Sequence, residues 1–360
     1  MPPPAGGGRR GLLGLAAPLL LPVQRRAPAP IPGTIVFLGD VMLGRDVSAM
    51  LRSQPPKWFW GEALGPLQTA EAVIANLESP ITAHAIQGNR TPKWYHFRAE
   101  PEATKILRVG RVRMVALANN HILDFGERGL DDTRAHLAAH HIVHAGAGPD
   151  LRAASAPAML DLPSCRVGML SATDQISEFG AGENRPGTWY ITIARGSPAL
   201  PLIAERVAAM RRDGADLIVL SLHWGPNLRR SPPDAFRDFA RAAIASGVDV
   251  VHGHSAHLVQ GVELAGRGVI LYDTGNCIDD YWRFLFVHQE WCFLFMLDHI
   301  GGRMRRLRLI PFLNQPMSLR LARGAQRSAM LAHMQALCAA HGTVTEEIEE
   351  GLAIALGEPA

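Results

Sequence analysis

Residues that could bind a metal ion or transfer a proton recur directly after short apolar runs of this 360-residue sequence. Asp40 follows the run that ends at Leu38, and comparable polar segments follow later runs: Asn76-Leu77-Glu78, Asn119-Asn120-His121, His223-Trp224-Gly225, His252 to His257, and Asp273 to Asn276. Carboxylate, amide and imidazole ligands together suit Mn, Fe or Zn, whereas Mg and Ca favour oxygen-rich sites. The pattern therefore predicts a site for a divalent metal.

Each of these segments, taken alone, has an ordinary structural explanation. A lone aspartate after a strand is usually part of a turn or a helix cap, and a single histidine such as His223 is usually packed or solvated. The cluster of His252, His254 and His257 is harder to explain in this way, because three imidazoles stand within six residues of sequence. No cysteine accompanies them, which excludes a structural zinc finger built on thiolates.

The apolar runs have the length and composition of buried strands. They are rich in Val, Ile and Leu and occupy residues 34–38, 72–75, 112–117, 166–170, 217–220, 248–251 and 269–272. Apolar residues at helical spacing lie between them, over residues 101–109, 127–140, 201–212 and 233–246. Strands that alternate with helices predict an α/β fold, in which ligands bind at the carboxyl ends of the strands. The polar segments would then meet in one cleft.

This pattern divides the sequence into three parts. Residues 34–312 carry the alternation and predict one α/β domain, whose last two strands form a hairpin that turns at residues 299–302. Residues 313–360 are predicted to form a helical extension packed on that domain, with helices over residues 318–340 and 345–356. Residues 1–33 read as a Pro/Ala/Gly-rich leader and linker.

The leader leaves the cellular compartment open between two alternatives. Arg9-Arg10 before the apolar stretch 11–23 resembles a twin-arginine export signal, and the stretch is shorter than the about 20 residues that cross a bilayer. Prolines interrupt it, however, and Arg25-Arg26 follow it directly. A cleaved signal for export to the cell envelope and a disordered leader of a cytoplasmic protein both fit.

Composition argues against several other classes of protein. The 36 basic and 33 acidic residues give a net charge of +3, which gives no support for nucleic-acid binding. The four cysteines include no C-x-x-C pair and are too few for a disulfide scaffold. No stretch after residue 33 approaches the length of a membrane span, so we expect no integral membrane span in the domain.

The motifs, in this order, look like those of one known family: Gly39-Asp40-Val41-Met42-Leu43-Gly44-Arg45, Ala75-Asn76-Leu77-Glu78, Ala118-Asn119-Asn120-His121, His223-Trp224-Gly225, and Gly253-His254 with His257. They resemble the CapA family, which is linked to bacterial capsule and poly-γ-glutamate biosynthesis. The resemblance covers residues 34–312 and is specific, because many short motifs occur in one order. CapA proteins are similar to calcineurin-like metallophosphatases, which implies a metallophosphatase-like two-sheet α/β sandwich flanked by helices.

The resemblance also implies roles for individual residues. Six of them match metal ligands of the wider superfamily: Asp40, Glu78, Asn120, His223, His254 and His257. His121 matches the general acid beside the amide ligand. Two departures leave one or two ions as alternatives: Met42 stands where the superfamily has a histidine, and Ser255-Ala256 lengthen the last motif.

Other polar and aromatic residues have two interpretations each. Arg45 could hold an anionic group of a substrate, because its planar guanidinium suits carboxylate or phosphate, or it could form a surface salt bridge. Asp124 could orient His121, but the start of the next helix is the favoured interpretation. For four aromatic residues we expect core packing in preference to a substrate groove: Trp58, Trp60, Trp94 and Tyr95. Four histidines are expected to be solvated: His136, His140, His141 and His144.

Two kinds of function follow from the resemblance. A metal-dependent hydrolase would activate water, with His121 donating a proton to the leaving group of a γ-glutamyl polymer, another anionic polymer, or a small-molecule phosphoester. The last of these would make it a metallophosphoesterase. A non-catalytic accessory subunit would instead bind the nascent polymer or polymer synthetase subunits. The set of ligand-like residues favours the hydrolase, and Met42 favours the accessory subunit.

Overall fold

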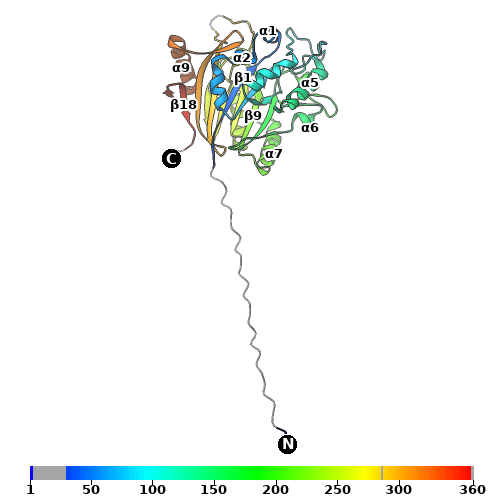
Figure 1. Cartoon of the computed structure of the whole chain (residues 1–360), viewed down its shortest axis with the longest axis vertical. Coiled ribbons are helices and arrows are strands. Elements are labelled where there is room, and N and C mark those ends of the chain that lie inside the picture. Colours follow the sequence, from blue (N-terminus) through cyan, green and yellow to red (C-terminus); the bar gives the residue numbers. More distant parts are fainter. Residues whose placement is uncertain (3–29, 285–286, 358–360) are drawn as a thin grey trace. The chain divides into compact units, whose positions relative to one another are not determined.

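Two β-sheets lie face to face in this chain, and helices cover their outer faces (Figure 1). A computed structural model describes residues 1–2, 30–284 and 287–357. Within that part, the residues from Ile31 onward form one compact unit. The expected α/β sandwich of two sheets flanked by helices is confirmed. The expected leader, residues 1–33, lies mostly outside the described residues.

The first sheet is built around β1, which pairs in parallel with β2 and antiparallel with β14. Its main path runs β17-β18-β15-β14-β1-β2-β3-β4, with β13 beside β1 and β16 beside β15. The strands are β1 (Pro32–Val41), β2 (Ala72–Leu77), β3 (Val112–Ala116), β4 (Val143–Ala145), β13 (Asn276–Ile278), β14 (Trp291–Ile300), β15 (Arg303–Gln315), β16 (Ser318–Leu321), β17 (Glu346–Ile348) and β18 (Gly351–Ala355).

The second sheet has the order β11-β12-β10-β9-β7-β6, and β5 and β8 form a small separate pair. Its strands are β6 (Ala158–Asp161), β7 (Arg166–Thr173), β9 (Leu217–His223), β10 (Val250–His254), β11 (Val262–Ala265) and β12 (Gly268–Leu271). The small pair consists of β5 (Ala147–Gly148) and β8 (Gly187–Thr188).

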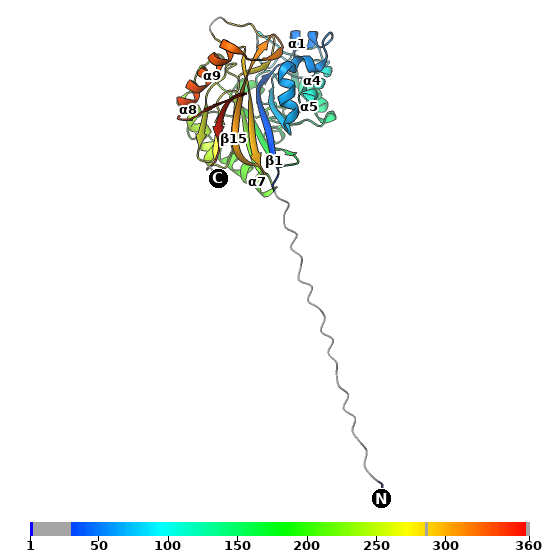
Figure 2. The same cartoon turned by 60° about the vertical axis from the view of Figure 1, so that its left-hand side comes forward.

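Helices fill the connections between strands, with α4 and α5 on one side of the sheets and α8 on the other (Figure 2). Helix α9 inserts its buried residues into the core between the sheets. Their bounds are α1 (Arg45–Met50), α2 (Pro56–Trp60), α3 (Leu64–Thr69), α4 (Thr104–Val109), α5 (Gly126–Ala139), α6 (Leu151–Ala154), α7 (Ala199–Arg212), α8 (Asp234–Ala245) and α9 (Gly324–Ala339). Short 3₁₀ turns are η1 (Gly61–Ala63), η2 (Pro101–Ala103) and η3 (Ser177–Phe179). Among the described residues, no helix combines the length and the apolar character that a membrane crossing would require.

The period-two alternation of a strand divides the apolar residues of β1 between two cores. Val36 and Leu38 pack under the helices that cover the first sheet. Ile35 and Phe37 face the second sheet and pack with residues of β7, β9 and β14. A third cluster lies between the second sheet and α7 and α8. Because both faces of the middle of β1 are buried, residues 35–38 are all apolar and do not alternate with polar residues.

Parallel pairing brings the predicted site residues to one end of the strands. In the first sheet, Asp40 of β1 stands beside Asn76 of β2 and Asn276 of β13. In the second sheet, His254 of β10 stands beside His223 of β9. The carboxyl ends of strands in both sheets therefore deliver polar side chains to a common place, as the sequence predicts.

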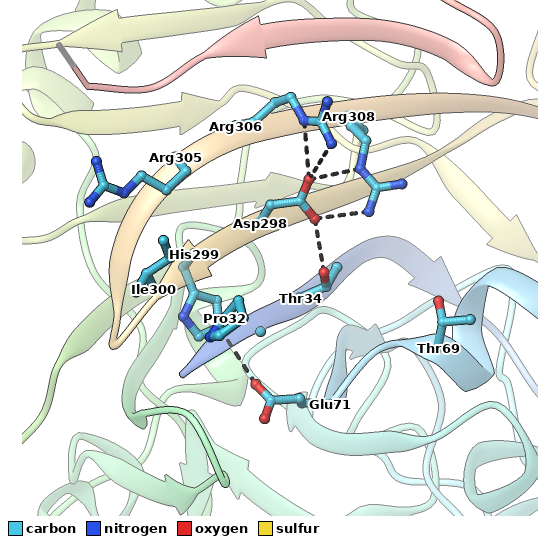
Figure 3. Close-up of a pocket in the computed structure, with 11 residues that line it drawn as sticks. Pro32, Thr34, Thr69, Glu71, Asp298, His299, Ile300, Arg305, Arg306 and Arg308 are labelled. Carbon is cyan, nitrogen blue, oxygen red and sulfur yellow. Dashed lines mark hydrogen bonds and ion pairs between the residues drawn. The ribbon is translucent and has the colours of Figure 1, made fainter. Parts of the chain in front are cut away.

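The opposite end of β1 carries a different polar network (Figure 3). Thr34 donates a hydrogen bond to Asp298, whose carboxylate also accepts a two-pronged pair from Arg308, at 2.8 Å for each bond. Arg306 reaches the same carboxylate at 3.2 Å. These residues line a surface pocket and join β1, β14 and β15. The pocket lies about 20 Å from Asp40, the length of six strand residues, and is separate from the predicted site.

The C-terminal segment differs from the helical extension that the sequence predicts. Helix α9 falls within the predicted 318–340, but residues 345–356 form the strand pair β17–β18, and β18 pairs with β15. Helical spacing of a short apolar run does not distinguish it from a strand, and here the alternate residues Leu352 and Ile354 enter the core between the sheets. The C-terminal segment is therefore part of the first sheet.

We expect Leu352→Ala to lower the free energy of unfolding by about 2–5 kcal/mol, because it removes a fully buried side chain and leaves a cavity. Urea unfolding followed by circular dichroism measures the change. Val344→Ala is the matched control, since Val344 is 84% exposed and lies just before the same strand pair. Equal stability of the two variants would show that β18 does not contribute to the core.

Candidate metal centre

Asp40 is shared by two groups of side chains, each of which could hold a metal ion. One group is Asp40, His223 and His254, and the other is Asp40, Glu78 and His257. In each group the candidate ligand atoms all lie within 4.8 Å of one another. None of the five residues is more than 8% exposed. The structure therefore brings together five of the six residues predicted as ligands.

The two carboxylate oxygens of Asp40 face different histidines. Oδ1 lies 3.7 Å from His254 Nδ1 and 3.8 Å from His223 Nδ1. Oδ2 lies 3.2 Å from His257 Nδ1 and 3.3 Å from the backbone nitrogen of Ser255. A carboxylate in this position could bridge two ions, one on each side. One and two ions both remain compatible with the geometry.

Three buried atoms of predicted ligands have no hydrogen-bond partner among the described residues: Glu78 Oε1, Asn120 Oδ1 and His223 Nε2. Buried polar atoms are almost always paired, because an unpaired one costs about 1–3 kcal/mol. Glu78 Oε1 and His223 Nε2 face each other at 3.8 Å. Two ligands of one ion with bonds of about 2.0–2.2 Å lie no more than about 4.4 Å apart. The residues therefore fit a divalent metal.

The charges in the site are strongly perturbed. Burial lowers the pKa of His257, but the carboxylates of Glu78 and Asp40 outweigh it and raise that pKa to about 10. Burial and the nearby Asp40 carboxylate raise the pKa of Glu78 to about 8. Burial opposes ionisation of Asp40, yet its hydrogen bond with His257 and the neighbouring histidines hold its pKa below the usual range. Burial lowers the pKa of His223 to about 3, which keeps that imidazole in the neutral form that binds metals.

Two asparagines hold Asp40 in place. Asn76 donates to Asp40 Oδ1 at 2.7 Å, and Asn119 donates to Asn76 Oδ1 at 3.0 Å and to the carbonyl of Leu77 at 2.8 Å. Both lie inside the motifs that the sequence singles out, but without a predicted role. Their pairing links the ends of β1, β2 and β3 behind the candidate ligands.

His121 lies in a buried cluster with Asp124 and Lys93. Asp124 Oδ2 lies 2.6 Å from His121 Nδ1, and Asp124 Oδ1 pairs with the ammonium of Lys93. Lys93 also donates to the carbonyl of Asn120 and lies 3.0 Å from His121 Nδ1. Helix α5 begins at Gly126, so the helix-start interpretation of Asp124 is wrong and the orienting interpretation fits. Lys93 has no recognisable signal in the sequence, because it lies in an irregular segment.

The surroundings of His121 favour the neutral imidazole. Burial lowers its pKa to about 4, Asp124 opposes this shift, and the nearby Lys93 cation adds to it. The Asp124 carboxylate, which only accepts, lies closer to His121 Nδ1 (2.6 Å) than the Lys93 ammonium, which only donates (3.0 Å). We therefore assign the proton to Nδ1, shared with Asp124, and the lone pair to Nε2. At pH 7, His121 can therefore accept a proton at Nε2.

Arg45 lies at the edge of this cluster and belongs to neither ligand group. Its guanidinium is 32% exposed on the side chain and pairs with Asp280 at 3.2 Å. It also lies over the ring of Phe97, which stacks on His121 at 3.9 Å between centroids. Arg45 therefore forms the predicted salt bridge, and the ring of Phe97 separates its guanidinium from His121.

Several expectations for other residues need correction. His252 contacts the carbonyl of Leu38 and the hydroxyl of Ser221 and belongs to neither ligand group. Trp60 is buried as expected, but Trp94 and Tyr95 are 98% and 66% exposed, so the core-packing prediction is wrong for both. Lys93, directly before Trp94, turns inward to Asp124, and the two rings lie in solvent.

Two further residues concern the sequence predictions: Met42, which stands in place of a metal-binding histidine, and His144, which is predicted to be solvated. Met42 is fully buried and accepts a contact from the backbone nitrogen of Gly44 at 3.1 Å. His144 lies in β4 and is half-buried, and its buried Nδ1 has no hydrogen-bond partner in the described structure. Burial lowers its pKa to about 4, so the solvated interpretation is wrong for this histidine.

Two contacts from the segment after β12 complete the site and are missing from the sequence prediction. Tyr281 donates its hydroxyl to Glu78 Oε2 at 2.7 Å. Asn276 Oδ1 lies 2.9 Å from His257 Nδ1. Asn276 ends the polar segment Asp273 to Asn276 that the sequence singles out, although without a predicted role, whereas Tyr281 lies in no such segment.

These features define an α/β protein with a candidate metal centre at the carboxyl ends of its strands. Residues 34–281 match the family described as bacterial capsule synthesis protein PGA_cap, and the chain belongs to that family. A Mycobacterium tuberculosis protein, named a probable polyglutamine synthesis accessory protein, is 32% identical over 337 residues, which cover 81% of this chain and 87% of the relative.

Two relatives of lower identity are named CapA. The PGA biosynthesis protein CapA of Bacillus subtilis is 28% identical, over 68% of this chain and 62% of its own length. The capsule biosynthesis protein CapA of Bacillus anthracis is 24% identical, over 72% and 62%. Among solved structures, the NAD nucleotidase NadN of Haemophilus influenzae has a TM-score of 0.43 at 11% identity, covering 86% of this chain and 56% of that one. That likeness is too distant to indicate a function.

Proposed function

We propose that this chain is a metal-dependent hydrolase that acts on a γ-glutamyl or other anionic cell-surface polymer. One observation carries the proposal: the buried atoms Glu78 Oε1 and His223 Nε2 face each other at 3.8 Å, and no described residue offers either of them a hydrogen bond. A cation beside both atoms would satisfy them. The polymer class rests on the family and on the relatives, which are named for capsule and poly-γ-glutamate biosynthesis.

In this proposal the two groups around Asp40 hold one or two divalent ions, with Asn120 as a further ligand. A bound ion of this kind would activate water and polarise the carbonyl or phosphoryl oxygen next to the bond to be cleaved. The buried, neutral imidazoles of His223 and His254 need not lose a proton before they bind it.

In this proposal, His121 transfers a proton from the attacking water to the leaving group. Its Nδ1–H is held by Asp124, so Nε2 can take a proton from water and return it to the leaving amine or alkoxide. The role predicted from the sequence, proton donor, is therefore the second half of a shuttle. The adjacent Lys93 cation disfavours a lasting positive charge on His121 and so favours return of the proton.

A second candidate, a non-catalytic accessory subunit that binds the polymer or its synthetase, has specific support. Met42 stands buried where the resembled superfamily has a metal-binding histidine. The Mycobacterium tuberculosis relative is also named as an accessory protein of polymer synthesis.

One assay separates the two candidates. The purified chain, loaded with Mn²⁺ or Zn²⁺, is incubated with poly-γ-glutamate and with a phosphate monoester, and release of free amines and of phosphate is followed. We expect cleavage of the polymer by the loaded wild type and none by Asp40→Ala. Polymer binding without cleavage of either substrate would support the accessory subunit, and cleavage of the phosphate ester alone would support the metallophosphoesterase.

A further inference from the structure

A chain of buried hydrogen bonds runs from the backbone of β1 to the far side of His254. The carbonyl oxygen of Leu38 lies 2.9 Å from His252 Nε2, and His252 Nδ1 lies 3.1 Å from the hydroxyl of Ser221. The same hydroxyl lies 2.9 Å from His254 Nε2. All four residues are 0% exposed, so solvent cannot supply or remove a proton along this path.

The contacts of His252 assign its imidazole proton to Nε2. A carbonyl oxygen accepts and cannot donate, so the contact with Leu38 requires a proton on His252 Nε2. Thr274 Oγ1, at 3.3 Å from the same nitrogen, donates its own proton to the carbonyl of Gly253 and can likewise only accept. His252 is buried and forms no ion pair with any described carboxylate, so it is neutral and Nδ1 keeps a lone pair.

The direction of the remaining bonds follows from that assignment. Ser221 must donate its single hydroxyl proton to His252 Nδ1, which leaves its oxygen as an acceptor for His254. His254 therefore carries its proton on Nε2 and has a lone pair on Nδ1. That nitrogen lies 3.7 Å from Asp40 Oδ1 and 3.0 Å from His223 Nδ1, inside the first ligand group.

We propose that the Leu38 carbonyl, His252 and Ser221 act as positioning groups for His254. They fix the tautomer with the proton on Nε2, so that the lone pair of Nδ1 faces Asp40. Histidine ligands generally use one nitrogen for the metal and donate the other to a fixed acceptor, which orients the ring. Here the acceptor is a serine whose own direction is set by the backbone of the other sheet. The part of the inference that concerns metal affinity rests on the proposed function, whereas the tautomer does not.

The neighbouring strand offers a matched control. Ser171 of β7 pairs in register with Ser221 of β9 and is 1% exposed. Its hydroxyl is buried and has no hydrogen-bond partner among the described residues. Ser171→Ala therefore removes the same atom from an equally buried strand position without touching His252 or His254. Ser221→Thr keeps the hydroxyl and suits a strand.

Two measurements test the proposal. Long-range ¹H–¹⁵N NMR of the imidazoles in the metal-free wild type should show His254 with its proton on Nε2 and a lone pair on Nδ1. Titration with Mn²⁺ alone, followed by the EPR signal of the free ion, should show about 10–100-fold weaker binding at one site in Ser221→Ala. Ser171→Ala and Ser221→Thr should bind as the wild type does.

The outcomes separate this inference from the function that it accompanies. A proton on Nδ1 of His254 in the wild type would overturn the inference, and so would equal Mn²⁺ affinity of Ser221→Ala and Ser171→Ala. If the wild type binds no Mn²⁺, the proposed hydrolase fails while the NMR assignment still decides the tautomer. The NMR measurement needs no variant, so a misfolded Ser221→Ala does not remove the test.

Discussion

Asp40→Asn should bind divalent metal more than about 100-fold more weakly than the wild type, which exceeds the 10–100-fold effect of losing an outer partner. Asp40 is the one residue common to both candidate groups, and its two oxygens face opposite sides of the site. The amide keeps the size of the side chain but lacks the negative charge, and its nitrogen cannot bind a cation. Equilibrium dialysis against Zn²⁺ followed by elemental analysis measures the loss.

The control and two further variants sharpen this result. Asp298→Asn makes the same chemical change at the opposite end of the first sheet and should bind metal normally. If two ions bind, His254→Ala and Glu78→Gln should each lose one of them, because each belongs to only one group. Full metal content in Asp40→Asn would end the metal interpretation of this site.

His121→Ala should retain its metal and lose turnover by about 10²–10⁴-fold, the usual contribution of a positioned acid or base. The reason is its place beside Asn120 and its hydrogen bond to Asp124, which hold one ring nitrogen and leave the other free. Turnover is measured on whichever polymer or phosphate ester the wild type cleaves, and metal content is measured on the same samples.

Three results are distinguishable for this variant. Loss of metal together with activity would make His121 a ligand in place of a proton carrier. Unchanged turnover would remove it from the mechanism. His136→Ala, which changes a histidine on α5 outside both ligand groups, is the control and should behave as the wild type.

The strands and the candidate ligands were predictable because both follow from local sequence. Runs such as residues 34–38 and 217–220 are apolar enough to be buried on both faces, and Asp40 and His223 come at or just after their ends. Parallel pairing then requires the strand ends of each sheet to meet. The site could be predicted where its residues lie opposite one another on paired strands, as Asp40 and Asn76 do.

The rest of the site depends on contacts that no local pattern encodes. Lys93 and Tyr281 reach His121 and Glu78 from irregular segments, where nothing in the spacing fixes the direction of a side chain. The C-terminal strand pair differs from the predicted helix because its apolar residues suit either structure, and pairing with β15 decides between them. Trp94 departs from the predicted core packing because that prediction follows a general tendency: large aromatic residues are usually buried, whereas Trp94 is exposed.

The candidate ligands come from both layers of the sandwich: Asp40 and Glu78 from the ends of β1 and β2, and His223 and His254 from β9 and β10. A bound ion would therefore act as a removable cross-link between two sheets that otherwise meet through apolar side chains and a few hydrogen bonds, such as that between His252 and the carbonyl of Leu38. Such a cross-link requires both sheets to be in place, so we expect it to form late in folding, and it must break before the sheets separate. Interactions that are absent from the transition state slow unfolding and leave folding unchanged. A bound metal would then lower the rate of unfolding and leave the rate of folding unchanged.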